Sequence, residues 1–167
     1  MSAKSFRIGH LDLSIDRSTF NSGTSALDRY FHRQVSQDIK RRVTACFAAL
    51  DANDRVAGFY TLASASIFLD QLPEAAAKKL PKYREVPVVR MGRLAVDQDH
   101  KSKGLGSALL AHALERSAAV EIGAFAMIVD AKDESAARFY EHHGFMRLET
   151  PPLALFLPLA TVKQLVK

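Results

Sequence analysis

Two lysines and two glycines lie close together in the run KSKGLG, which spans residues 101–106. The run follows an apolar, strand-like segment, GRLAV, and precedes the helix-like SALL. The first N–H groups of a helix have no partners within it and lie at the positive end of its dipole, so they attract anions. Gly104 and Gly106 would let the backbone approach a ligand closely, and Lys101 and Lys103 would add positive charge. This order of elements is typical of a phosphate-binding loop, although an ordinary tight turn has the same composition.

The run differs from two better-known phosphate-binding loops. It does not end in Gly-Lys-Ser or Gly-Lys-Thr, so it is not a P-loop. It also lacks the third glycine of the dinucleotide-binding fingerprint. Taken alone, KSKGLG therefore leaves the identity of the ligand open.

A second side chain that could take part in catalysis is the tyrosine in FYEHHGF. Tyr140 shares one face of a predicted helix with Ala136, Phe139 and His143, which is also the pattern of an ordinary core aromatic. A phenol with an unperturbed pKa of about 10 is protonated at neutral pH and can donate a proton. The adjacent His142 and His143 lack the three- or four-ligand set of a metal site, so no metal is expected.

Hydrophobic patterning in the first half predicts strands and one helix. A strand is predicted at FRIGHLDL, and apolar residues recur every four positions from Leu27 to Ile39, which is helical spacing. Ser25 and Asp28 fit a capping box at the start of that helix. The runs VTACFAAL and RVAGFYTLAS predict two strands joined by a polar turn at residues 51–54.

The second half predicts alternating strands and helices. The proline-punctuated segment from Gln71 to Pro87 keeps apolar residues, so it is interpreted as an ordered insertion. GAFAMIVDA is an unbroken apolar run, as expected of a strand covered on both faces. DESAARFYEHHGF predicts a helix with Asp133 at its N-cap and Gly144 just beyond its end. The order of elements predicts an α+β fold, with residues 1–167 forming one domain around a single mixed sheet.

Composition excludes several classes of protein. Apolar residues make up 48% and charged residues 25% of the 167 positions, which is ordinary for a soluble globular domain. No segment approaches the roughly 20 consecutive apolar residues of a membrane helix, and the N-terminus lacks the apolar core of a secretory signal. Cys46 is the single cysteine, so an intramolecular disulfide is impossible and a buried, inert thiol is expected. A cytoplasmic location is predicted.

The formal net charge of +5 is unevenly distributed along the chain. One basic stretch is opposed by Asp38 alone and contains Arg29, Arg33, Lys40, Arg41 and Arg42. A second stretch contains Lys78, Lys79, Lys82, Arg84, Arg90, Arg93, Lys101 and Lys103. Such residues usually form solvated helix faces, but two separate clusters also fit a polyanionic partner, because basic patches concentrate phosphates.

The motifs of the second half, taken together, resemble the GNAT N-acetyltransferases. The series runs GRLAV, KSKGLG and SALL, then a strand that ends in VDA, then FYEHHGF. The pyrophosphate motif of that family starts with Arg or Gln, and Lys101 departs from this pattern. The departure puts little in doubt, since the position contributes mainly through main-chain amides. The resemblance covers the whole chain in element order and implies a mixed, mostly antiparallel sheet.

The resemblance implies acetyl-CoA as the acetyl donor. In that family the strand that corresponds to Arg93–Val96 pairs its main chain with the pantetheine arm, and the loop that corresponds to residues 101–106 receives the pyrophosphate. A tyrosine at the position of Tyr140 lies near the thioester sulfur and acts as general acid, and Phe139 packs beside it. The residues implied to bind acetyl-CoA are Leu94, Ala95, Val96, Lys101, Ser102, Lys103, Gly104, Leu105, Gly106 and Phe139.

Motifs of the first half and the middle narrow the resemblance. FNSGTSALDRYF, RRVTACF, AGFYTLAS and especially LPKYREVPVVRMGRLAV look like the acetyltransferase toxins of bacterial type II toxin–antitoxin modules. Those enzymes acetylate the α-amine of the amino acid on charged tRNA and block translation. The implied substrate is therefore aminoacyl-tRNA.

The chemistry of the amine agrees with that substrate. A free α-amine has a pKa of about 7.7–8.0, against about 10.4 for lysine, so part of it is already unprotonated at cellular pH. Such a nucleophile needs little help from a general base, and no motif fixes one. The basic side chains expected to contact the tRNA backbone are Arg41, Arg42, Lys78, Lys79, Lys82, Arg90 and Arg93.

The resemblance also implies partners. Toxins of this kind are usually neutralised by a ribbon-helix-helix antitoxin whose C-terminal segment covers the active site, and homodimers are common among them. One alternative is an acetyltransferase for a protein N-terminus or a small amine. Another is a binding module on the same scaffold that lacks catalysis.

Overall fold

The structure, a computed structural model, describes residues 5–165 of the 167. Within that range a mixed sheet of seven strands has the order β1-β2-β3-β4-β5-β7-β6. The strands are β1 Arg7–His10, β2 Ala45–Leu50, β3 Val56–Phe68, β4 Glu85–Val96, β5 Ala126–Asp130, β6 Met146–Arg147 and β7 Ala154–Pro158. β4 and β5 are parallel, whereas β1–β2, β2–β3, β5–β7 and β6–β7 are antiparallel. The predicted α+β fold with one mixed, mostly antiparallel sheet is confirmed.

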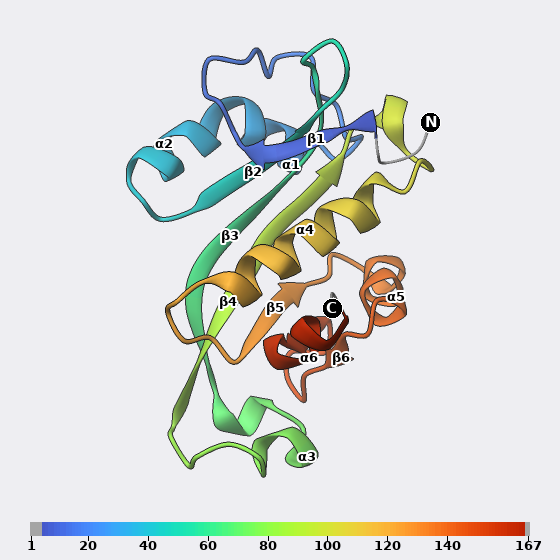
Figure 1. Cartoon of the computed structure of the whole chain (residues 1–167). Helices are drawn as coiled ribbons and strands as arrows, with labels where there is room; N and C mark the ends of the chain where they lie inside the picture. Colours follow the sequence, from blue (N-terminus) through green and yellow to red (C-terminus); the bar gives the residue numbers. More distant parts are fainter. Residues whose placement is uncertain (1–4, 166–167) are drawn as a thin grey trace. The chain divides into compact units, whose positions relative to one another are not determined.

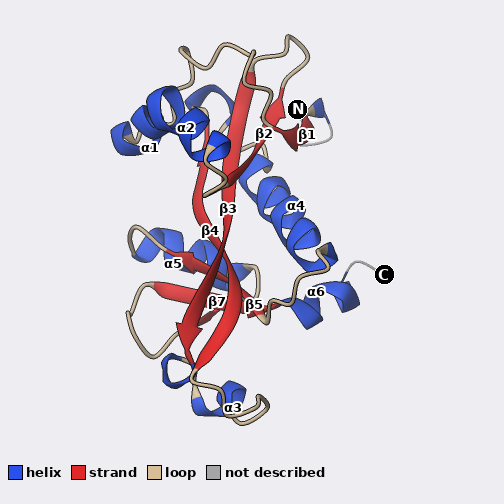
Figure 2. Cartoon of the chain, turned by 90° about the vertical axis from the view of Figure 1, so that its left-hand side faces the viewer, coloured by secondary structure: helices blue, strands red, loops and turns tan. Residues whose placement is uncertain are grey.

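Helices flank the sheet (Figures 1 and 2). The longer elements are α1 Ser25–Arg29, the π-helical η2 Tyr30–Gln34, α2 Val35–Lys40, α4 Leu105–Ala119, α5 Glu134–His142 and α6 Leu159–Leu165. The short ones are η3 Leu69–Gln71, α3 Glu74–Ala77 and η4 Gln98–His100. None of the helices in the described part of the chain is long and apolar enough to cross a membrane.

The chain forms two compact units, and the long strands β3 and β4 contribute to both. The first unit comprises residues 1–63 and 92–113, and the second comprises residues 64–91 and 114–167. The arrangement of these units as one domain over residues 1–167 stays a prediction.

Successive side chains of β3 point to opposite faces of the strand and contact different helices of the first unit. Phe59 points to the helical segment α1–η2–α2 and stacks on Phe31, with ring centroids 4.2 Å apart and planes 11° apart. Its neighbour Tyr60 points to the opposite face, where its hydroxyl lies 2.6 Å from Nδ1 of His112 on α4. The segment α1–η2–α2 and α4 therefore cover opposite faces of the strand, as the period of two requires.

The core of the second unit forms around β5. Ala126, Met127, Ile128 and Val129 are each at most 1% exposed, which confirms the prediction of a strand covered on both faces. The predicted insertion between Gln71 and Pro87 is ordered and carries α3. The Leu69 amide, just before the insertion, donates to the carbonyl of Arg84 near its end at 3.0 Å.

Local predictions in the first unit have mixed outcomes. The turn at residues 51–54 joins β2 and β3 as expected, and the Asp51 amide donates to the Arg55 carbonyl at 2.9 Å. Cys46 is buried, which confirms the expected burial, and burial raises the pKa of its thiol to about 12, which agrees with an unreactive thiol.

The helix predicted from Ser25 differs in two ways. It is interrupted by the π turn η2, which leaves the adjacent Tyr30 and Phe31 both buried in the same core cluster. The capping box of Ser25 and Asp28 is wrong, because Asp28 accepts hydrogen bonds from the amide and hydroxyl of Ser22 instead. The residue at the N-cap is Thr24.

We expect Gly58→Ala to destabilise the fold by about 1–3 kcal/mol, because a Cβ there would overpack the interior. It would lie 2.8 Å from the Leu109 side chain and 2.9 Å from the Ala95 carbonyl. Gly9→Ala is the matched strand control, since a Cβ at Gly9 meets nothing within 4 Å. Thermal unfolding of both variants measures the difference, and equal melting temperatures would contradict the packing account.

Candidate functional site

The loop that precedes α4 has the backbone of a tight, irregular turn. It follows η4, and its positive φ angles are 67° at Ser102 and 79° at Gly104. A Cβ at Gly104 would meet nothing within 4 Å, so the glycine is required by its φ angle and not by crowding in this structure. Leu105 is buried and anchors the first turn of α4 in the core, which leaves its backbone as the part able to contact a ligand.

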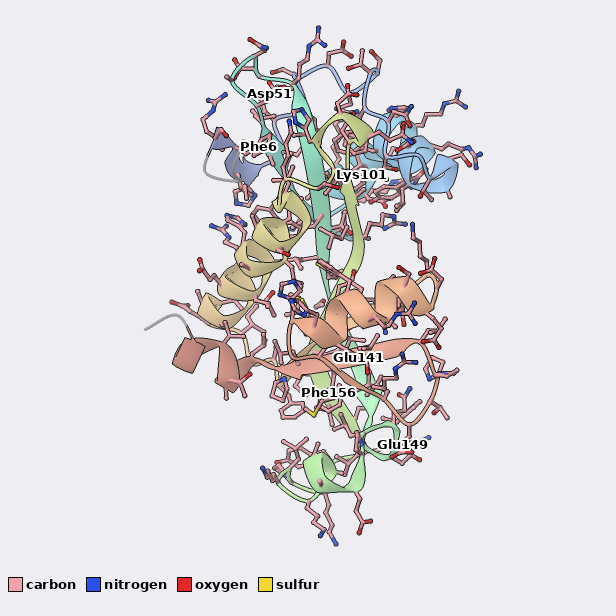
Figure 3. All side chains as sticks on the ribbon, turned by 90° about the vertical axis from the view of Figure 1, so that its right-hand side faces the viewer. Phe6, Asp51, Lys101, Glu141, Glu149 and Phe156 are labelled. Carbon is pink, nitrogen blue, oxygen red and sulfur yellow. The ribbon has the colours of Figure 1, made fainter. Side chains whose placement is uncertain are left out.

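The lysines of this loop hold it in place. Lys101 donates from Nζ to the Ser22 carbonyl at 2.7 Å (Lys101 is labelled in Figure 3). Lys103 Nζ lies 3.2 Å from Nδ1 of His100, whose Nε2 is 3.7 Å from Asp51 Oδ2. The ammonium of Lys101 is therefore committed to a carbonyl. The expectation that Lys101 adds positive charge to an anion site stays a prediction.

Two loops of the first unit are joined by further hydrogen bonds. The Asn21 amide donates to Asp97 Oδ2 at 3.0 Å, and the Gln98 amide donates to the Asn21 carbonyl at 2.8 Å. The Asp97 amide in turn donates to the Ala57 carbonyl of β3 at 2.8 Å. Together with the bond from Lys101 to Ser22, these contacts form what we call the interlock. Local sequence patterns contain no signal for it, since its partners lie far apart in the chain.

The end of β4 carries the three strand residues predicted to bind acetyl-CoA. Ala95 is buried in the core of the first unit, and Leu94 and Val96 are half-buried. The parallel ladder of β4 with β5 runs from Val88 to Met91 and stops there. The main chain of residues 94–96 therefore lies beyond that ladder, so its edge suits an added strand-like ligand.

Tyr140 lies on α5 in the second unit, on a helix whose ends follow the predicted signals. Asp133 caps the helix by accepting from the Ala136 amide at 2.8 Å, and Gly144 beyond its end has a φ of 95°. Arg147 donates to Glu134 on the first turn at 2.8 Å. These contacts fix the helix that carries the tyrosine.

The ring of Tyr140 is buried between aromatic neighbours. It packs against Phe139 and Phe145, with centroids 5.3 and 5.5 Å away. Burial raises the pKa of Tyr140 to about 12, and the Asp130 carboxylate acts in the same direction. Its hydroxyl has no hydrogen-bond partner among residues 5–165. The result is a protonated phenol that is available to a ligand.

The histidines near Tyr140 are not arranged as metal ligands. Burial, and then the adjacent His142, lower the pKa of His143, which is in ring contact with Phe139 at 5.0 Å. Within the described residues no group of three His, Cys, Asp or Glu side chains is placed to hold a metal ion.

The basic residues predicted to contact tRNA divide between the two units. Arg41 and Arg42 are exposed at the end of α2 in the first unit. Around α3 in the second unit, the exposed candidates for tRNA contact are Lys78, Lys79 and Lys82. The remaining two are engaged within their own units, since Arg90 pairs with Asp130 and Arg93 stacks 3.4 Å above the Tyr30 ring. Arg93 therefore has a structural contact that the sequence did not predict.

Comparison with known proteins adds the family. Residues 12–145 match the acetyltransferase (GNAT) family profile. The tRNA-acetylating toxin of Mycobacterium tuberculosis (strain ATCC 25618 / H37Rv) is 35% identical over 153 residues, which cover 90% of both chains. Two solved structures are similar over nearly their full length. AtaT complexed with acetyl-methionyl-tRNAfMet has a TM-score of 0.89 and 28% identity, covering 97% of this chain and 99% of that one. AtaTR bound with AcCoA has a TM-score of 0.84 and 26% identity, covering 98% and 99%.

The raised pKa of Tyr140 is directly testable. At about pH 10.5 an ordinary phenol is mostly ionised, whereas a buried phenol with a pKa near 12 stays protonated. The ultraviolet difference spectrum between wild type and Tyr140→Phe should therefore show no phenolate signal from this residue at that pH. A phenolate signal that titrates near pH 10 and disappears in the variant would contradict the burial account.

Proposed function

Because the chain belongs to the acetyltransferase (GNAT) family, we propose that it transfers an acetyl group from acetyl-CoA to the α-amine of the amino acid on charged tRNA. An acetylated α-amine is an amide and can no longer attack the growing peptide. The protein therefore acts as a toxin that blocks translation. The observation that carries this proposal is the 35% identity to a tRNA-acetylating toxin over 90% of both chains.

The residues at the end of β4 and before α4 fit acetyl-CoA. The edge of β4 at Leu94, Ala95 and Val96 has the extended backbone that pairs with a pantetheine arm. The loop from Lys101 to Gly106 leads into the fifteen residues of α4, whose first N–H groups suit a pyrophosphate. Within this loop Lys101 is held by its hydrogen bond to the Ser22 carbonyl, a contact that we call the tether. The rest of the proposed pyrophosphate site, or seat, consists of Ser102, Lys103, Gly104, Leu105 and Gly106.

Acetyl-CoA supplies a thioester whose carbonyl carbon accepts the amine. The C–N bond forms as the C–S bond breaks, and the proton lost by the amine balances the proton gained by sulfur. A phenol with a pKa near 12 is a weaker acid than a thiol of about 8.5, so full proton transfer from Tyr140 to a free thiolate is uphill. We infer that the Tyr140 O–H donates a hydrogen bond to the departing sulfur and keeps its proton, while the proton lost by the amine passes through water to the thiolate. Phe139 supports its ring by packing.

The amine requires little activation. An α-amine with a pKa of about 7.7–8.0 is partly neutral at cellular pH, and water can accept its proton. Phosphate contacts along the tRNA then supply most of the affinity. Arg41, Arg42 and the α3 residues Lys78, Lys79 and Lys82 are the exposed candidates for these contacts. Arg90 and Arg93 remain candidates in the proposal, although each already has a partner within its unit.

The proposal includes the partners of a toxin. A cell that makes such an enzyme needs a neutraliser, and we propose a ribbon-helix-helix antitoxin whose C-terminal segment covers the active site. We also propose a homodimer in which each chain contributes one acetyltransferase domain over residues 1–167. Charged tRNA and acetyl-CoA meet in the cytoplasm, which is the location proposed for the protein. We propose no role for a metal in the reaction.

The central experiment measures transfer of labelled acetyl groups to charged tRNA by wild type and Tyr140→Phe. We expect label on particular aminoacyl-tRNAs and a rate lower by about 10²–10³-fold in the variant, because one positioned hydrogen-bond donor to the departing sulfur is lost. Acetyl-CoA affinity should change little. No label on any charged tRNA, from protein that binds acetyl-CoA, would favour the alternative of a protein N-terminus or small amine as substrate.

The tether from Lys101 gives a second test. Lys101→Met keeps the length of the side chain but removes its hydrogen bond to Ser22. A hydrogen bond to a charged donor contributes about 1.5 kcal/mol at the low end of its usual range, so its loss is expected to weaken the acetyl-CoA complex by roughly tenfold. Lys40→Met is the matched control for charge, because Lys40 is exposed at the end of α2 in the same unit and lies outside the proposed acetyl-CoA site. Equal acetyl-CoA affinities in wild type and Lys101→Met would show that the tether does not shape the seat.

A further inference from the structure

A polar hollow of about 480 Å³ lies beside α1 and η2 in the first unit. Its lining includes Asn21, Asp28, Arg29, His32 and Arg33. We propose that this hollow binds a backbone phosphate of the tRNA acceptor end, with Arg29 and Arg33 as its ligands. The inference deepens the proposed function and rests on it for the choice of tRNA.

The two arginines are arranged to act together. They are four residues apart on the continuous helical segment α1–η2, and residues at this spacing lie on the same face of a helix. Both are exposed, and within residues 5–165 neither guanidinium has a carboxylate within 4 Å or a hydrogen-bond partner. Guanidinium groups bind phosphate oxygens through paired N–H donors, which makes this pair suited to a phosphate.

The acid in the hollow does not neutralise them. Asp28 Oδ1 accepts the Ser22 amide at 2.9 Å and the Ser22 hydroxyl at 2.7 Å. His32 Nε2 donates to the Phe20 carbonyl at 2.8 Å, since a carbonyl can only accept. Both side chains therefore stabilise the loop that forms one wall, and the two guanidinium groups dominate the charge of the hollow.

The lining favours a phosphate within a polymer over a small metabolite. Phe20 is the one apolar residue of the lining and is only 3% exposed, so the hollow lacks the mostly hydrophobic and aromatic side-chain lining that is typical of a small-molecule pocket. A tRNA does not need such a surface, because its other phosphates bind elsewhere on the protein and add to the affinity.

The position of the hollow agrees with the reaction. Asn21 lines the hollow and is also part of the interlock with Asp97 and Gln98. The hollow is therefore joined within one unit to the loop proposed as the pyrophosphate seat. The aminoacyl end of the tRNA must reach the acetyl group, and a phosphate site in the unit that also carries the proposed acetyl-CoA strand and loop is compatible with that requirement. The phosphates of acetyl-CoA are the competing source, and the experiment separates the two.

The test measures binding of uncharged bulk tRNA in the presence of CoA, by filter retention at several salt concentrations. The variants are Arg29→Gln, Arg33→Gln, the double Arg29→Gln/Arg33→Gln and the double Arg29→Lys/Arg33→Lys. Arg55→Gln is the matched control, because Arg55 is exposed, lies in the same unit and does not line the hollow. Affinity for CoA is measured on the same proteins.

We expect the glutamine double variant to bind tRNA about tenfold more weakly and to lower the salt slope by roughly 0.7–0.9, the contribution of one phosphate contact. The lysine double variant should be intermediate, because it keeps the charge and loses the paired donors. Arg55→Gln should bind tRNA and CoA as wild type does.

Unchanged tRNA affinity in the glutamine double variant would overturn the proposal, as would a loss of CoA affinity with tRNA binding intact. The readout requires no turnover. If the hollow variants lose tRNA binding while wild type transfers no acetyl group to charged tRNA, the proposed function fails and the hollow stands.

Discussion

The interlock between the loops at residues 20–24 and 97–101 is the constraint on which the first unit depends. Lys101 reaches the Ser22 carbonyl, and Asn21 and Asp97 exchange hydrogen bonds with the facing loop. The Asp97 amide donates a hydrogen bond to β3, so the sheet holds both loops in position. A rigid pair of loops sets the geometry of the turn that enters α4, which is where a pyrophosphate is expected to bind.

This arrangement gives a physical meaning to the unusual lysine at position 101. A lysine there uses its ammonium as a tether, so the backbone amides and the helix start remain as the anion-binding groups. The same loop pair holds one wall of the hollow at Arg29 and Arg33. The two proposed phosphate sites are therefore positioned by one set of hydrogen bonds, and a change at Ser22 or Asp97 is expected to affect both.

Local signals predicted much of the fold. The apolar run of β5, the turn at residues 51–54, and the Asp133 cap with Gly144 depend on neighbours within a few residues, and each is confirmed. The resemblance of KSKGLG and FYEHHGF to family motifs located the loop before α4 and Tyr140, while their roles remain proposals.

Contacts between distant segments could not be predicted in the same way. Lys101 and Ser22 are 79 residues apart, and Asn21 and Asp97 are 76 apart, so no periodic pattern links them. The stacking of Arg93 on Tyr30 likewise joins distant segments of the chain. Tyr30 begins the π turn, which a period near four does not distinguish from an α-helix. Helical spacing therefore predicted the buried face correctly but did not reveal the π turn. The capping box predicted for Ser25 and Asp28 was wrong, because Asp28 bonds to Ser22 instead.

The central claim is that the α-amine of a tRNA-bound amino acid receives the acetyl group. The most direct measurement is mass spectrometry of the aminoacyl-adenosine released by nuclease from tRNA that has reacted with acetyl-CoA and the protein. The account predicts one added acetyl group that resides on the amino acid after the ester is hydrolysed. An acetyl group on the nucleoside, or a product in which neither part is modified, would contradict it.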